Sequence, residues 1–117
     1  MKRLALAMAA AAAMMAATPA FAHTSVRETN IAENATLARA PANFTIVFSG
    51  ATGLASVTLT DATGRPVALT YTPPHQMASS FAIPLPTLTP GAYTLSWRTI
   101  ARDGHAMPGA VHFTIPG

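Results

Sequence analysis

The apolar positions divide the chain into a continuous apolar start and a long alternating remainder. Residues 4–17 are all Leu, Ala or Met. From residue 24 onward, apolar and polar side chains alternate over short stretches that are separated by Gly, Pro, Asn and Asp. A period of two is typical of strands with one buried face, and no part of this region keeps the helical period of 3.6. The pattern therefore predicts β-structure throughout the chain after its apolar start.

The alternating region indicates about seven short strands. Three of them place apolar triplets on one face: Phe44, Ile46 and Phe48; Tyr93, Leu95 and Trp97; Val111, Phe113 and Ile115. Further strands are expected at 24–29, 57–60, 66–69 and around 81–83, with turns at 49–53, 61–64 and 89–91 and loops at 30–41 and 73–77. Such spacing, with Gly and Pro at the turns, predicts an all-β fold: a small antiparallel sandwich or barrel with Greek-key connections.

The apolar start has the three parts of a secretory signal peptide. Lys2 and Arg3 precede the apolar run, and the small-residue ending Ala20-Phe21-Ala22 follows the helix-breaking Pro19. A membrane anchor is the alternative, but the run is shorter than the roughly 20 residues that a spanning helix needs. We therefore expect residues 1–22 to be a cleaved signal peptide and residues 23–117 to form one exported domain.

Removal of the signal peptide changes the charge of the chain. Residues 23–117 contain five Arg against two Glu and two Asp, a net charge of +1, and no Lys. With no basic cluster, nucleic acid is not expected as a partner. The chain also has no Cys, which excludes disulfides and thiolate metal ligands.

Two separated stretches suggest a metal site. Cleavage after Ala22 makes His23 the first residue, so that its α-amine and imidazole can bind one ion together. Asp103 and His105 lie two apart, and alternate residues of an extended stretch project to the same side. Three nitrogens and one oxygen suit copper(II). An isolated Asp-x-His is more typical of a polar turn before a strand than of a metal site, so the hypothesis depends on its combination with His23.

These residues belong to a wider pattern. It consists of the stretches 40–49, 59–64 and 85–98, followed by Asp103-Gly104-His105, Gly109 and Phe113-Thr114. With His23 as the mature N-terminus, residues 23–117 resemble the CopC family of periplasmic copper-binding proteins. The resemblance implies a small Greek-key β-barrel, close to an Ig-like sandwich, and one copper(II) ion bound by the His23 amine and imidazole, Asp103 and His105.

The resemblance also implies a role and a partner. We expect a periplasmic, monomeric, non-enzymatic protein that acts in copper homeostasis or resistance, or in delivery to a membrane copper transporter. The expected protein partner is an inner-membrane copper permease of the CopD type.

Two departures from the family pattern concern the metal. Gly50 occupies a position where family members often have an acidic residue near the copper(II) ion. Some members have a Met-rich loop for copper(I), whereas residues 23–117 keep only Met77 and Met107, with His75 in the corresponding loop. Two thioethers are a poor soft-ligand set, and Met commonly fills gaps in a core.

Two other functions are compatible with parts of the sequence. One is a secreted Ig-like interaction module without a metal. The other is a copper oxidase with a histidine brace, because an N-terminal His with a second His can form that site. Against it, the Asp103 carboxylate would stabilise copper(II) and occupy a position that oxygen chemistry needs.

Three further polar residues lie close to Asp103 and His105 in the sequence. Arg98 and Arg102 either orient Asp103 or are simply solvated. His112 alternates with Val111 and Phe113, so its side chain is expected to face solvent.

Overall fold

The computed structural model describes residues 24–117; the expected signal peptide and His23 lie outside them. These residues form seven strands: β1 (Val26–Thr29), β2 (Ala35–Thr36), β3 (Asn43–Asp61), β4 (Pro66–Val67), β5 (Ala78–Pro84), β6 (Gly91–Ile100) and β7 (Ala106–Ile115). Within residues 24–117 there is no helix long and apolar enough to cross a membrane. The all-β prediction is confirmed.

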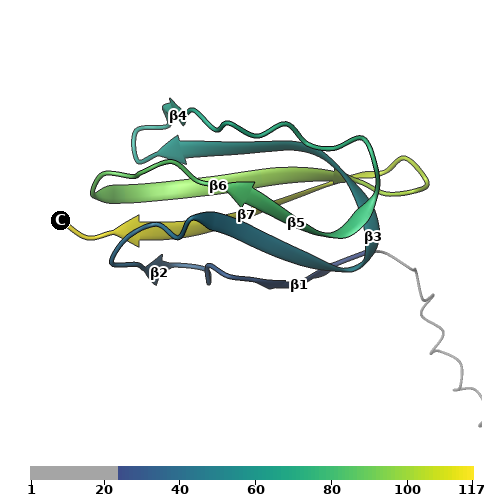
Figure 1. The fold of residues 1–117 in the computed structure, drawn as a ribbon, viewed down its shortest axis with the longest axis horizontal. Helices are drawn as coiled ribbons and strands as arrows, with labels where there is room; N and C mark the ends of the chain where they lie inside the picture. The colour runs from purple at the N-terminus through teal and green to yellow at the C-terminus, as the bar shows by residue number, and fades with distance from the viewer. Residues whose placement is uncertain (1–23) are drawn as a thin grey trace, which may run out of the picture.

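The strands form two layers that share β3 (Figure 1). The first half of β3 lies between β1 and β5, and all three strands are antiparallel to their neighbours. The second half of β3 pairs with β4 and β6, and β7 continues that layer antiparallel to β6. The two-residue β2 pairs with β7 in the parallel direction. The result is the small antiparallel sandwich that the strand pattern predicted.

The continuous course of β3 corrects one prediction. We expected a turn at 49–53, but the strand runs without interruption from Asn43 to Asp61. Its pairing changes there: Thr52 is opposite Ala78 of β5, whereas Gly53 is opposite Ile100 of β6. A Cβ atom on Gly53 would lie 3.3 Å from the carbonyl oxygen of Ile100. This glycine therefore permits a close strand approach where β3 changes layers, and the chain does not reverse.

Other bounds differ less. β7 begins at Ala106, five residues before Val111 of the predicted triplet, and β2 lies inside the stretch 30–41 that we expected to be a loop. The turn at 61–64 is confirmed, because the Gly64 N–H donates to the Asp61 carbonyl oxygen over 2.9 Å and Gly64 has a φ of +82°. Short irregular pairings such as β2 depend on tertiary contacts and have no periodic signal of their own.

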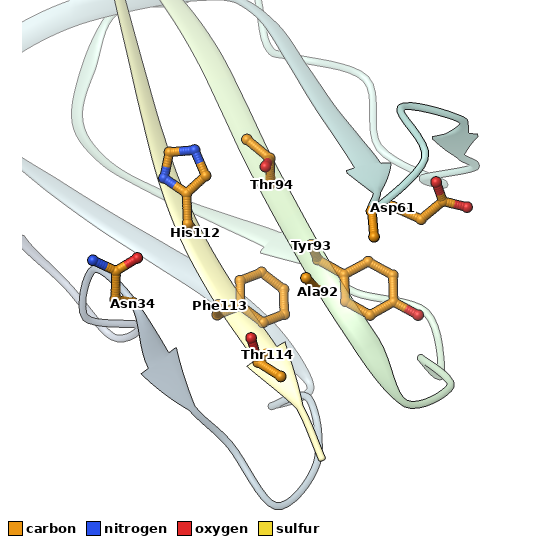
Figure 2. Close-up of a pocket in the computed structure, with 9 residues that line it drawn as sticks. Asn34, Asp61, Ala92, Tyr93, Thr94, His112, Phe113 and Thr114 are labelled. Atoms are coloured by element: carbon orange, nitrogen blue, oxygen red, sulfur yellow. The ribbon is translucent and has the colours of Figure 1, made fainter. Parts of the chain in front are cut away.

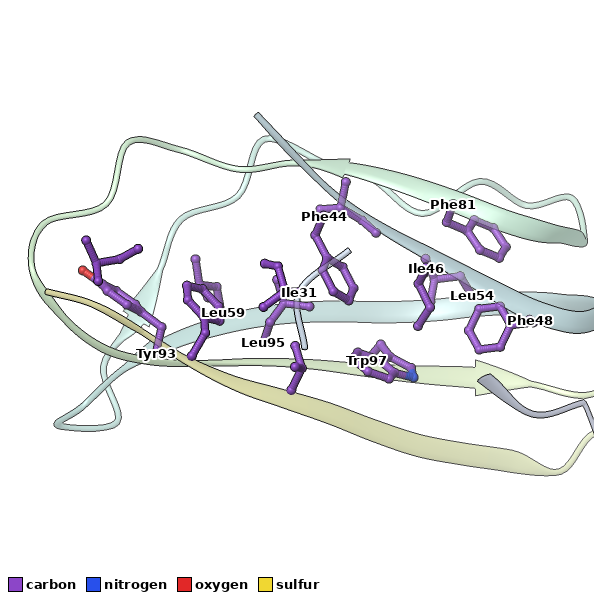
Figure 3. Packing of buried hydrophobic residues seen from close by; sticks show 14 residues of the cluster. Ile31, Phe44, Ile46, Phe48, Leu54, Leu59, Phe81, Tyr93, Leu95 and Trp97 are labelled. Carbon is purple, nitrogen blue, oxygen red and sulfur yellow. The ribbon is translucent and has the colours of Figure 1, made fainter. Parts of the chain in front are cut away.

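The core lies between the two layers and contains all three predicted apolar triplets (Figure 3). Ile31, Leu54, Leu59, Phe81 and Ile83 complete it. Phe44 of one layer and Trp97 of the other stack with ring centroids 5.7 Å apart. Burial of these apolar side chains supplies the main stabilisation of a sandwich that has no disulfide.

Candidate metal centre

Asp103 and His105 lie in the tight turn that joins β6 to β7. The last pair of the ladder is Ile100 opposite Ala106, and the Ala101 N–H donates to the His105 carbonyl oxygen over 2.8 Å. The Gly104 N–H donates to the Ala101 carbonyl oxygen over 2.8 Å. Gly104 has a φ of +93°, a region that glycine adopts without a steric penalty. The sequence Asp-Gly-His thus brings both polar side chains to the tip of one hairpin.

The two side chains contact each other. The Asp103 carboxylate accepts the His105 backbone N–H at Oδ1 over 3.0 Å, and its Oδ2 lies 2.9 Å from His105 Nδ1. Both side chains are well exposed, at 57% for Asp103 and 73% for His105. A carboxylate at Nδ1 orients the ring and leaves the other ring nitrogen, Nε2, available to a metal, as in many protein metal sites. If Asp103 is also to bind the ion, this contact must open.

Two buried threonines fix the backbone at the base of this turn. Thr52 and Thr99 are the buried polar residues of the described chain. The Thr52 hydroxyl lies 3.2 Å from the carbonyl oxygen of Ile100, and the Thr99 hydroxyl lies 3.2 Å from that of Met107. These carbonyls lie on the two strands that enter and leave the turn. Sequence analysis missed both residues, because a Thr in a strand gives no local sign of its partner.

The described chain begins at the same end of the molecule. Ser25 and Ser49 are joined twice: the Ser25 N–H donates to the Ser49 hydroxyl over 2.9 Å, and the Ser49 N–H donates to the Ser25 carbonyl over 2.8 Å. Thr24 lies beside Gly50, with its hydroxyl 3.8 Å from the position of a Cβ there. Figure 1 shows the start of β1, the bend of β3 and the β6–β7 turn at one end of the sandwich. The prediction for His23 itself falls outside the described residues.

Asp103 and His105 supply only part of the expected set of four copper(II) donors. Over residues 24–117, no group of three or more His, Asp or Glu side chains could hold a metal ion. A four-donor site at this turn would therefore need donors other than the His, Asp and Glu side chains of residues 24–117.

The other residues singled out from the sequence lie on other elements, except Arg102, which precedes Asp103 in the same turn. His75 and Met77 precede β5 and are exposed, whereas Met107 is half-buried on β7, opposite Thr99. Arg98 and Arg102 are exposed. His112 is exposed on β7, as its alternation with buried Val111 and Phe113 predicted.

The fold and the site define a class of protein: small two-layered antiparallel β-sandwiches that carry an acid–imidazole pair in a turn at one end. The family model of the CopC domain matches residues 26–116. The chain therefore belongs to the CopC family, and the resemblance stated from the sequence is confirmed.

Solved structures agree with this assignment. CopC from Methylosinus trichosporium OB3b aligns with a TM-score of 0.66 and 21% identity over 80% of this chain and 94% of that one, a likeness of fold. PcoC, a methionine-rich copper resistance protein from Escherichia coli, aligns with a TM-score of 0.56 and 26% identity over 80% of this chain and 98% of that one. No curated protein gave a significant sequence match.

Proposed function

We propose that this protein is a periplasmic copper(II)-binding protein that acts in copper homeostasis or resistance. One copper(II) ion is bound by the His23 amine and imidazole, Asp103 and His105. The observation that carries the proposal is the position of the Asp103–His105 pair, which lies on a turn at the end of the sandwich where the described chain begins. Membership in the CopC family and likeness to a copper resistance protein support the same metal.

The reach of the chain is compatible with this ligand set. Ser25 is fixed to Ser49, and two residues of extended chain span up to about 7 Å beyond it. Gly53, four residues after Ser49, is paired with Ile100 at the base of the Asp103–His105 turn. Ser25 and the base of the Asp103–His105 turn therefore both contact β3, which supports a ligand set whose members are 80 residues or more apart in the sequence.

The donor types suit a bound cargo ion. Amine, imidazole and carboxylate form a tetragonal nitrogen and oxygen set that copper(II) prefers, and no thiolate is available to reduce it. Because Asp103 and His105 are exposed, an ion there can be acquired and released without unfolding the sandwich. These properties favour a carrier over an oxidase, and an inner-membrane permease of the CopD type is the partner that we propose for delivery.

The proposal requires export and cleavage between Ala22 and His23, and mass spectrometry of the exported protein tests this first. Copper(II) titration then tests the amine. Residues 23–117 contain no Lys, so acetylation at amines modifies the α-amine alone. We expect the unmodified protein to bind one ion and the acetylated protein to bind it at least about tenfold more weakly, a loss of about 1.4 kcal/mol. Equal affinity of the two forms would contradict an amine ligand.

Side-chain variants test the turn. His105→Ala and Asp103→Asn should each weaken copper(II) binding, whereas His75→Ala, at another exposed His, should not. Electron paramagnetic resonance should show fewer coordinated nitrogens in His105→Ala and an unchanged number in Asp103→Asn. If none of these changes affects binding, or if no copper is bound at all, the metal-free interaction module becomes the better interpretation.

A further inference from the structure

A second imidazole–carboxylate pair lies away from the β6–β7 turn. The Glu33 carboxylate accepts the His112 backbone N–H at Oε1 over 2.9 Å, and its Oε2 lies 2.8 Å from His112 Nδ1. This is the same two-point contact that Asp103 makes with His105. Glu33 and His112 are 79 residues apart in the sequence, so the fold has to bring them together.

The loop that carries Glu33 is built around His112. The Asn34 N–H donates to the His112 carbonyl oxygen over 2.7 Å, which adds a third hydrogen bond between the loop and this one residue. Asn34 has a φ of +63°, a left-handed conformation that side chains other than Gly, Asn and Asp rarely adopt. Figure 2 shows Asn34 and His112 on neighbouring segments. The backbone therefore takes an uncommon conformation where it holds the carboxylate on His112.

This contact sets the state of the imidazole. The hydrogen bond from the His112 backbone, followed by that from its side chain, holds the pKa of Glu33 below its ordinary value of 4.5. An ionised carboxylate only accepts hydrogen bonds, so in the neutral imidazole the proton lies on Nδ1 and the lone pair on Nε2. The His112 side chain is 53% exposed, which leaves that lone pair within reach of a solute.

The imidazole borders a polar groove on the outer face of the β6–β7 layer. The groove has a volume of about 450 Å³. Thr94, which is opposite His112 in the ladder, contributes a hydroxyl, and Asn34 contributes an amide (Figure 2). The Asp61 carboxylate, at the far end of the groove, accepts hydrogen bonds from Thr63 and Arg65 of its own turn. An oriented Nε2 that is open to solvent at the edge of a polar groove suits a divalent transition-metal ion, because imidazole favours copper, zinc and nickel.

We propose that His112 is a second divalent-metal site, at which a copper(II) ion binds through Nε2 while Glu33 supports the ring from behind. The site has one protein nitrogen and otherwise oxygen or water ligands, so it binds more weakly than the site proposed at the turn. It differs from an ordinary exposed His, such as His75, in its fixed ring and its carboxylate partner. The inference does not depend on the proposed function, because it uses none of His23, Asp103 and His105.

Paramagnetic broadening of amide NMR signals by copper(II) tests the site. In the exported protein carrying His105→Ala, substoichiometric copper(II) should broaden the signals of Thr94, His112 and Thr114 before those around His75, which serves as the internal control. His112→Gln should abolish the first effect. Glu33→Gln, whose amide oxygen can still accept the His112 backbone N–H, should require about tenfold more copper(II) for the same broadening.

The outcomes separate the two sites. Broadening around residues 103–105 in the unmodified protein reports on the proposed function, whereas broadening around His112 reports on this inference. Equal broadening at His75 and His112, or an unchanged copper(II) requirement in Glu33→Gln with a native amide spectrum, would overturn the inference.

Discussion

The indole ring of Trp97 lies directly over Gly109, its partner across the β6–β7 ladder. A Cβ atom on Gly109 would lie only 2.5 Å from Cε2 and 2.6 Å from Cζ2 of the indole. Trp97 is itself buried and stacked on Phe44, so the ring has no free space into which it could move. Packing against the indole therefore requires a glycine at position 109, whereas the backbone conformation there does not.

Gly109→Ala should lower the free energy of unfolding by about 1–3 kcal/mol, because the added methyl overpacks a filled core. Urea denaturation followed by Trp97 fluorescence measures this loss. Gly50→Ala is the matched control: its Cβ would have only an ordinary contact of 3.8 Å with Thr24. The control should leave stability nearly unchanged or slightly raised. Equal effects of the two substitutions would contradict the packing argument.

Thr52→Val should destabilise the protein by about 1 kcal/mol, since it removes the hydroxyl of buried Thr52 from the Ile100 carbonyl and changes the volume little. Thr52→Ser keeps a hydroxyl and separates the effect of the hydrogen bond from that of shape. Thermal unfolding of both variants measures the difference. A Thr52→Val protein as stable as the parent would show that this contact contributes nothing to holding the turn.

Gly50→Asp should strengthen copper(II) binding by about tenfold, or about 1.4 kcal/mol, if the ion lies where we propose. Position 50 has room for a side chain, and that side chain would be beside Thr24, the neighbour of His23. A carboxylate there would add an oxygen donor or a nearby negative charge. Competition titration measures the change, with Gly50→Asn as the uncharged control. Equal affinities of the two variants would place the ion elsewhere.

Acid should loosen the Glu33–His112 contact. The hydrogen bond from the His112 backbone lowers the pKa of Glu33 from 4.5, so the native state favours its ionised form. Its stabilising effect is complete above pH 4.5 and is lost as the pH falls through the lower, native pKa. The difference in urea stability between the parent and Glu33→Gln should therefore shrink from pH 6 to pH 3.

The comparison with Glu33→Gln also removes a second acid-sensitive group. The pKa of Asp61 is lowered as well, chiefly by the Thr63 hydroxyl, and both proteins lose that contribution alike. A stability difference that stays constant down to pH 3 would show that the Glu33 carboxylate is not held by His112 in solution.

Sequence periodicity predicted the buried faces well. Phe44, Leu95 and Phe113 are all buried where alternation placed them, because each strand has one face toward the core. The pairing of Asp103 with His105 was also predicted, but from the geometry of an extended stretch, whereas a tight turn brings the two side chains together. The uninterrupted β3 was not predicted, because Gly50 and Gly53 are typical of a turn and only the neighbouring strands show that the chain continues.

Contacts between distant residues had no signal in a single sequence. Nothing near Glu33 indicates His112, and nothing near Ser25 indicates Ser49. The ligand role of His23 remains a prediction, because that residue lies outside the described chain. The structure adds the position of Thr24, the residue that follows His23, which lies beside Gly50 of β3.

The shared strand β3 also determines how the protein can denature. Each layer uses one half of the same strand, so neither layer is complete once β3 is detached. The aromatic contact between Phe44 and Trp97 then couples the halves through their side chains. Unfolding should consequently be an all-or-none transition, without a half-folded intermediate that keeps one sheet intact.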